Sequence, residues 1–124
     1  MKHSTAVLKL WQKLFNANDL NIVKTYSNDA VFLGTFAKNI KQGRSLILPY
    51  FVGLFKKENL KVDFTDEIFI NDIEDGYIIS GIYIFSYIEN GETQKVRARY
   101  SFTIQYINGK PYIINQHSSV VPEQ

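Results

Sequence analysis

The sequence predicts an α+β domain in which a curved antiparallel sheet wraps around three N-terminal helices. Apolar residues follow a helical period in the first half of the chain, and the period changes to two from Leu60 onward. Two Asn-Gly pairs, beginning at Asn90 and Asn108, then separate long strands, because this dipeptide favours two-residue hairpin turns. A strongly curved sheet of this kind would form a cone with a cavity inside.

The N-terminal third predicts two helices and one strand. A first helix is expected from a cap at Ser4 to about residue 17, because apolar residues recur there at helical spacing. Asp19 is expected to cap a second, short helix. The polar pair Asn28-Asp29 should then turn the chain into a strand over residues 30–36.

A third helix is predicted to begin between Arg44 and Leu48. Pro49 should lie in its first turn, because proline deeper in a helix removes a hydrogen bond and clashes with the preceding turn. Four long strands follow as a meander, with a turn at residues 74–76 and the two Asn-Gly turns between them.

Composition narrows the possible functions. The 124 residues form one predicted domain, 1–124, and the net charge of +2 comes from scattered residues, which argues against nucleic acid or an anionic membrane as a partner. With no cysteine, and with His3 and His117 far apart, no metal site is expected, and no cofactor is implied. The chain has no signal-peptide pattern or membrane-length apolar run, so we expect a cytoplasmic protein.

The strand register follows from the turns if both Asn-Gly loops contain two residues. Across the first, Tyr100 then pairs with Gly81, and Phe102 pairs with Ile79. Across the second, Tyr100 pairs with His117. Gly81, Tyr100 and His117 would therefore form one row on the inner face, where the glycine leaves room for a ligand or water.

That row is the predicted centre of a ligand cavity. The aromatic content of 15% supplies rings that can line it, although such rings equally build cores. A histidine beside a tyrosine on an apolar face can be a satisfied core pair, and Gly81 can mark a bulge or bend. The residues expected to line the cavity are Trp11, Tyr26, Phe32, Tyr50, Gly81, Tyr83, Tyr100, Phe102, Asn115 and His117.

The opposite, outer face of the sheet is predicted to carry three isoleucines and two arginines. Isoleucines on an outward face favour a covering partner, and a second copy of the chain is the simplest one, with the arginines in interface ion pairs. A solvated face is the alternative. These predicted interface residues are Ile78, Ile82, Ile84, Arg97 and Arg99.

Asp66 is the one acid for which strict alternation predicts an inward side chain. A bulge in the segment FTDEIF would instead rotate it outward, and we favour the bulge. If Asp66 did point inward, it would be a candidate general base with a raised pKa.

The order of elements resembles the cone-shaped superfamily of nuclear transport factor 2, scytalone dehydratase, ketosteroid isomerase and the SnoaL-like cyclases. The C-terminal strand pair is similar to the calcium/calmodulin-dependent kinase II association domain and its stand-alone bacterial relatives. The residues that match this family's pattern are Ala98, Arg99, Tyr100, Ser101, Phe102, Gly109, Lys110, His117, Ser119 and Pro122.

The resemblance implies a self-associating domain, a homodimer or higher oligomer, with a small-molecule cavity. Two positions that are arginine in the kinase domain's cavity are Phe102 and Ser118 here, so an anionic ligand held in that manner is not implied. The alternative is a SnoaL-like enzyme that transfers a proton on a hydrophobic ring or carbonyl compound. Its catalytic candidates are His117, Tyr100 and Asp66.

Overall fold

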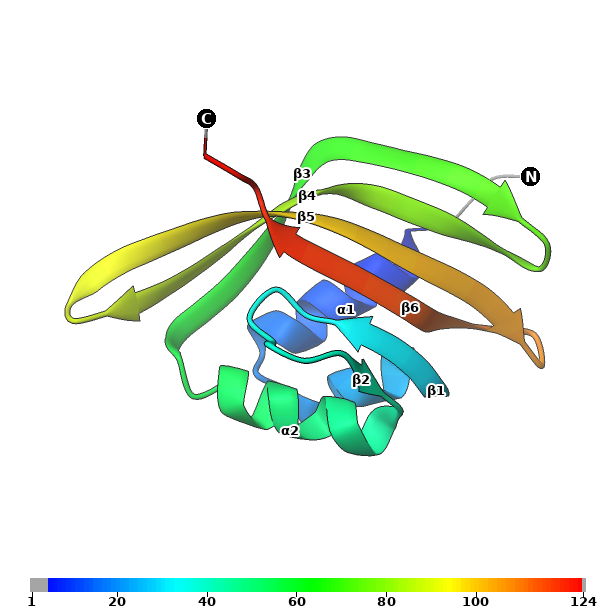
Figure 1. The fold of residues 1–124 in the computed structure, drawn as a ribbon, viewed down its shortest axis with the longest axis horizontal. Helices are drawn as coiled ribbons and strands as arrows, with labels where there is room; N and C mark the ends of the chain where they lie inside the picture. Colours follow the sequence, from blue (N-terminus) through cyan, green and yellow to red (C-terminus); the bar gives the residue numbers. More distant parts are fainter. Residues whose placement is uncertain (1–4, 124) are drawn as a thin grey trace.

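A six-stranded curved sheet, open at both edges, covers the helices in the computed structural model, which describes residues 5–123 (Figure 1). The helices are α1 (Ala6–Asn16), the short 3₁₀ helix η1 (Leu20–Thr25) and α2 (Arg44–Leu54). The strands are β1 (Tyr26–Leu33), β2 (Lys41–Gln42), β3 (Glu58–Ile73), β4 (Gly76–Glu89), β5 (Glu92–Ile107) and β6 (Lys110–Val120).

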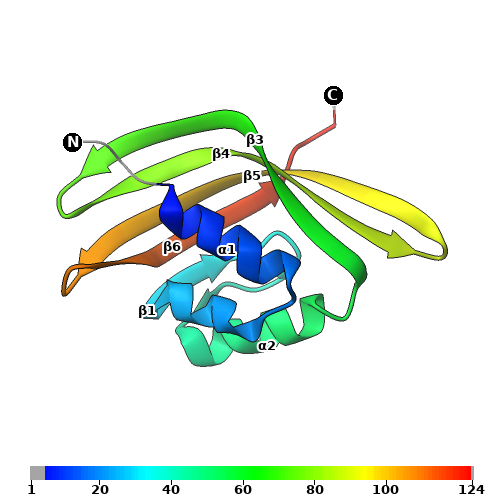
Figure 2. The same ribbon diagram turned by 180° about the vertical axis from the view of Figure 1, so that it is seen from behind.

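The strand order is β2-β1-β6-β5-β4-β3, so the last four strands form the predicted meander. Strand β1 runs parallel to β6, and every other pairing is antiparallel. The sheet bends around α1, which lies across its concave side, with α2 along the lower edge (Figure 2). The predicted α+β class, with a curved sheet over N-terminal helices, is therefore confirmed; the short strand β2 was not predicted.

The hairpin turns lie where the sequence predicts them. Asn90 and Gly91 have φ values of 53° and 76°, and Asn108 and Gly109 have values of 52° and 80°. These left-handed conformations suit asparagine and glycine, and they produce the twist that a two-residue hairpin needs. The register between β4 and β5 is also as predicted, with Gly81 opposite Tyr100.

Helix α1 is attached to the sheet by packing and by hydrogen bonds. Its side chains Trp11 and Phe15 are each 1% exposed in the core. At its C-terminal end, the Asn16 amide donates to the Val62 carbonyl at 3.1 Å and accepts from the Val62 N–H at 2.8 Å. Gln12 donates to the same carbonyl. These amides take the place of a neighbouring strand along the edge of β3.

The N-terminal third differs from the prediction in its boundaries. Ser4 lies outside the described residues, while Asp19 caps η1 as expected by accepting from the Asn21 N–H. Strand β1 begins at Tyr26, before the predicted turn at Asn28-Asp29. A register shift between Tyr26 and Val31 accommodates these polar residues within the strand, so they do not end it.

The predicted position of Pro49 is wrong. Helix α2 begins at Arg44, which places Pro49 at the sixth helical residue, in the second turn. The carbonyl that loses its partner there belongs to Ser45, four residues earlier. Ser45 and Pro49 are both exposed, so water can hydrate that carbonyl, and the helix continues.

Strand β6 contains a bulge that the register prediction missed. Ile104 pairs with Ile113, but Thr103 pairs with Asn115, so Ile114 is an extra residue. Beyond this bulge, Tyr100 pairs with Ser118 and not with His117. The extra residue moves all later side chains of β6 to the opposite face. The predicted inward orientation of Asn115 and His117 is therefore wrong, and both residues are exposed.

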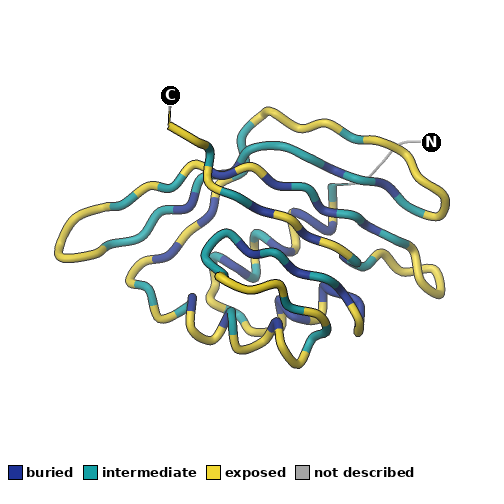
Figure 3. The backbone as a smooth tube through the Cα atoms, in the orientation of Figure 1, coloured by how far each residue is buried: buried dark blue, intermediate teal, exposed yellow. Residues whose placement is uncertain are grey.

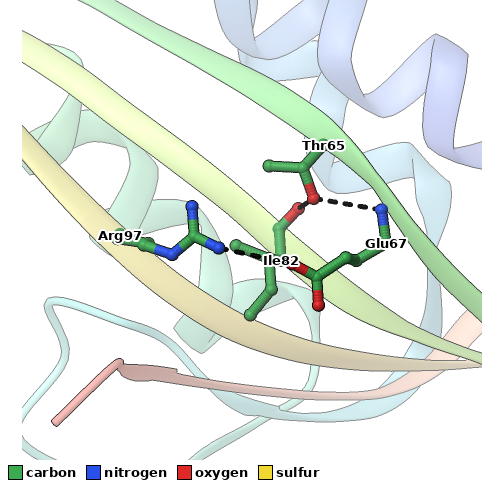
Figure 4. A network of polar contacts seen from close by, with 4 residues as sticks. All are labelled: Thr65, Glu67, Ile82 and Arg97. Atoms are coloured by element: carbon green, nitrogen blue, oxygen red, sulfur yellow. Dashed lines mark hydrogen bonds and ion pairs between the residues drawn. The ribbon is translucent and has the colours of Figure 1, made fainter.

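A bulge in β3 turns Asp66 outward, as the sequence favoured. The register shifts between Phe64 and Ile68, and Asp66 is exposed. Figure 4 shows the contacts there: Thr65 Oγ1 donates to the Ile82 carbonyl at 3.0 Å and accepts from the Glu67 N–H at 3.3 Å. The Thr65 hydroxyl thus replaces strand pairing that the bulge interrupts.

The core lies between the concave face of the sheet and the helices, where buried residues of both layers meet (Figure 3). Aromatic rings dominate it. Trp11 stacks on Phe15 at 5.2 Å between ring centroids, and Tyr83 lies 4.7 Å from Tyr100. Edge-to-face and offset arrangements of this kind add stability beyond area burial.

Candidate functional site

A buried hydrogen-bond network crosses the interior of the cone. Trp11 on α1 donates its indole N–H to the Tyr26 hydroxyl at 3.0 Å, and Tyr26 donates in turn to the Gln116 side-chain carbonyl. The Gln116 amide then donates to the Tyr83 hydroxyl at 3.4 Å. One helix and three strands are thereby linked through polar groups enclosed by rings.

The network continues toward the loop that follows β1. The Tyr83 hydroxyl donates to Ser118 Oγ at 2.6 Å, and Ser118 shares a hydrogen bond with Thr35. Gln116 and Ser118 are 2% and 6% exposed. They face inward only because the Ile114 bulge reverses the end of β6.

A cavity of about 10 Å³ lies beside this network, which is room for about one water molecule. Aromatic rings fill most of the rest of the concave side. The lining residues of the cavity are Trp11, Phe15, Phe32, Thr35, Tyr50, Phe51, Tyr83, Phe85 and Gln116. The predicted lining residues Trp11, Phe32, Tyr50 and Tyr83 are among them, and Tyr26 is linked to them through Gln116.

Tyr50 separates this cavity from a depression of about 600 Å³ on the surface, because its ring lines both. Its hydroxyl accepts a hydrogen bond from the Phe36 N–H at 3.4 Å. Lys41 and Lys57 line the outer depression. Tyr50 is therefore the side chain whose movement would connect the interior with solvent at this point.

Tyr100 has a buried hydroxyl without a hydrogen-bond partner. A Cβ at Gly81 would lie 2.7 Å from this hydroxyl and would overlap the backbone carbonyl of Glu67 in the β3 bulge. The predicted free space at Gly81 is thus occupied by protein atoms. Phe102, paired with Ile79, is fully buried beside Tyr100, with 5.3 Å between the ring centroids.

Burial keeps the interior phenols neutral. It raises the pKa of Tyr26 well above its ordinary value, and it raises the pKa of Tyr100 to about 12. Burial also raises the pKa of Tyr83, although hydrogen bonds with Ser118, Thr35 and Gln116 lower it. Desolvation disfavours the charged phenolate in each case.

The described interior offers no carboxylate or imidazole to act as a base. The buried polar residues there are Thr25, Ser27, Gln116 and Ser118, besides the tyrosines and the tryptophan. Of the catalytic candidates, only Tyr100 faces inward, since His117 and Asp66 are exposed. Neutral donors and acceptors in an apolar cavity suit the binding of a small neutral group better than proton abstraction.

The sequence contains a signal for the missed residues Gln116 and Ser118. Ile113 and Ile114 are adjacent apolar residues, and in a regular strand one of the two would face away from the core, whereas a bulge can avoid this. The Asn108-Gly109 turn sets the pairing only as far as the bulge. It does not determine which of the two isoleucines is the extra residue.

The outer face carries a second candidate surface. Ile78, Ile82 and Ile84 are half-buried there, and Arg97 and Arg99 are exposed, so all five predicted interface residues lie on that face. In addition, Phe69, opposite Ser80, is 67% exposed.

Both arginines of this face make side-chain contacts within the chain. Arg97 pairs with the Glu67 carboxylate at 3.4 Å (Figure 4), and Arg99 donates to Ser119 Oγ at 3.2 Å. Both side chains of the Arg97–Glu67 pair are more than half exposed. Such an ion pair adds little to the stability of the free chain.

Residues 5–123 contain neither a metal-binding group of side chains nor a helix that could span a membrane. No group of three or more histidine, cysteine, aspartate or glutamate side chains is arranged to hold a metal ion. No helix within the same residues has the length and apolar character that a membrane span requires.

Comparison with known proteins places the fold. The family described as "Calcium/calmodulin dependent protein kinase II association domain" matches residues 4–122. A crystal structure from Xanthomonas campestris, named as a candidate domain of that family, is 28% identical, with a TM-score of 0.87. The match covers 97% of this chain and 86% of that chain.

More distant structures share the fold. A nuclear transport factor 2-like protein from Salmonella enterica is 18% identical, with a TM-score of 0.83, and covers 97% of this chain and 89% of its own. A ketosteroid isomerase-like protein from Erwinia carotovora is 14% identical, with a TM-score of 0.77 and coverage of 95% and 93%. No curated protein sequence matches significantly.

Proposed function

Because the chain belongs to the calcium/calmodulin-dependent protein kinase II association-domain family, we propose that it associates with further copies of itself through the outer face of its sheet. The exposed outer face supports this proposal most directly. Phe69 is 67% exposed, and the half-buried Ile78, Ile82 and Ile84 lie on the same face of the next strand. Contiguous apolar surface of this kind favours a protein partner.

A two-fold pairing would place the same residues on both sides of the interface. Arg97 and Arg99 would then border the isoleucines at the rim, where the guanidinium groups can reach carboxylates of the second copy. Glu67, which pairs with Arg97 within one chain, is the nearest such carboxylate. If Arg97 of each copy paired with Glu67 of the other copy, every one of these charges would still have a partner of opposite sign.

The mass of the protein in solution tests this proposal. Light scattering after size exclusion should give a dimer or larger assembly at micromolar concentration. Ile82→Glu should give a monomer, because a carboxylate would be buried without a partner in the interface. Leu48→Glu is the control, since Leu48 is similarly apolar and 38% exposed but lies on α2. A monomeric wild type would contradict the proposal.

We further propose that the interior is a small-molecule pocket that opens at Tyr50. The hydroxyls of Tyr83 and Thr35 and the amide of Gln116 supply polar groups within an otherwise aromatic lining. A flat ring compound with one hydrogen-bonding group would match this chemistry.

A thermal-shift screen with phenols, aromatic ketones and small carboxylates tests the pocket. A ligand that binds the native state should raise the midpoint in proportion to its concentration and affinity. Tyr50→Ala should strengthen the shift by removing the ring that closes the cavity, whereas Tyr106→Ala, at an exposed position of β5, should leave it unchanged. No shift with any ring compound in Tyr50→Ala would contradict the proposal.

A further inference from the structure

Helix α1 carries a second apolar stripe, which is exposed at Ala6 and Leu10 and reaches the edge of the core at Leu14. Ala6, Leu10 and Leu14 follow one another at spacings of four residues, so they share one side of the helix. Leu10 is 49% exposed. This side forms one wall of a groove of about 490 Å³, which lies between α1, η1 and the start of β6. The groove is lined by Ala6, Val7, Leu10, Leu14, Asn21, Lys24, Thr25, Lys110, Pro111 and Tyr112.

A polar hollow of about 390 Å³ adjoins this groove. Lys110 and Tyr112 line both depressions, so the two meet along the first residues of β6. Arg44, at the start of α2, lies in the hollow, and its guanidinium is 6.0 Å from the centre of the Tyr112 ring. The remaining lining residues of the hollow are Ser27, Asn28, Ile107 and Asn108.

The groove and the hollow together form one trough, and the charged residues that line it all carry the same sign. Its charged lining residues are Lys24, Arg44 and Lys110, all cationic. The Arg44 guanidinium donates to the backbone carbonyls of Tyr26 at 2.8 Å and Lys24 at 3.4 Å. Both acceptors are neutral, and a guanidinium has five N–H groups, so Arg44 retains donors for an anion.

From this arrangement we propose that the trough binds an amphipathic anion, with an apolar chain along α1 and a carboxylate or phosphate group at Arg44 and Lys110. The apolar wall of Leu10 and Leu14 would cover the chain, while the cationic end would hold the charged group. A binding site of a few hundred cubic ångströms with few polar groups is typical of small-molecule sites. The site is separate from the interior cavity and from the outer face of the sheet.

Calorimetric titration with decanoate, below its critical micelle concentration, tests the proposal on the full chain. Saturable binding of one molecule per chain is expected, and decyl phosphate should bind as well. Shortening to octanoate should weaken binding by about fourfold for each methylene that is fully buried. Decylamine, which has the same chain and the opposite charge, should bind at least several-fold more weakly.

Matched variants locate the site. Leu10→Ser should weaken decanoate binding at least several-fold, whereas Leu20→Ser should not, because Leu20 is similarly exposed at 42% but does not line the trough. Lys110→Gln should weaken decanoate and leave decanol unchanged, and Lys9→Gln is its control on α1. Equal binding of decanoate and decylamine, non-saturating uptake, or unchanged affinity in both Leu10→Ser and Lys110→Gln would overturn the proposal. Binding to anionic lipid vesicles without binding of monomeric decanoate would do the same.

Discussion

Gly81 shows how one residue allows two irregular features to meet. The β3 bulge brings the Glu67 carbonyl against Gly81, and the Tyr100 hydroxyl lies on the same spot. Glycine is therefore required at this position because a side chain would collide with these atoms. The φ angle of Gly81 is not positive, so backbone conformation does not require glycine here. The sequence places Gly81 opposite Tyr100 correctly, but it does not indicate that backbone atoms fill the space.

Gly81→Ala is expected to lower the free energy of unfolding by about 1–3 kcal/mol, because the added methyl group overlaps a backbone carbonyl that cannot rotate away. Urea denaturation measures the change. Gly53→Ala is the control: nothing lies within 4 Å of a Cβ there, and alanine in α2 should raise stability by roughly 0.5–1 kcal/mol. Equal stability of Gly81→Ala and wild type would contradict the described packing.

Tyr100 gives the protein a pH dependence in alkaline solution. Its pKa is raised from 10.0 to about 12 by burial, so the folded state keeps a proton that the unfolded state releases between these values. Stability from this group is complete below pH 10 and is lost as the pH rises toward 12. Tyr100→Phe should therefore lose less stability than wild type between pH 10 and 12. Denaturation midpoints measured across this pH range test the assignment. An equal fall of the midpoint with pH in both proteins would refute it.

At the scale of elements, α1 is fixed to β3 by an amide that imitates a strand. Asn16 exchanges two hydrogen bonds with the backbone of Val62, as a paired residue in a sheet would. Asn16 ends the helix at the place where β3 presents an unpaired edge. The contact thus orients α1, and with it Trp11, whose indole N–H is the first donor of the interior network.

Asn16→Ala should lower the free energy of unfolding by about 2 kcal/mol, since two partly buried hydrogen bonds are lost. The Val62 amide should also exchange its hydrogen faster. Lys13→Ala, at an exposed position of the same helix, should change neither quantity appreciably. Unchanged exchange at Val62 would show that the amide does not protect this edge.

The sequence predicts regular elements better than their interruptions. The turns at Asn90 and Asn108 have the expected dihedral angles, since few residues adopt positive φ readily. The bulge near Asp66 was inferred because an inward acid would be unfavourable. No such penalty marks Ile114, as either isoleucine can face the core, so the orientation of His117 could not be derived from the turn.

At the scale of the whole molecule, the curved sheet presents two faces with different chemistry. Its concave face is filled by rings and a neutral polar network, and its convex face keeps Phe69 and three isoleucines near solvent. Membership of an association-domain family and this convex surface together support self-association as the central claim.

Intermolecular nuclear Overhauser effects test that claim most directly. A mixture of isoleucine-methyl-labelled and unlabelled chains reports only contacts between copies. We expect such contacts at Ile78, Ile82 and Ile84, with none at the buried Ile47 of α2. A complete absence of contacts between copies, or contacts confined to residues of the helical layer, would contradict association through the outer face of the sheet.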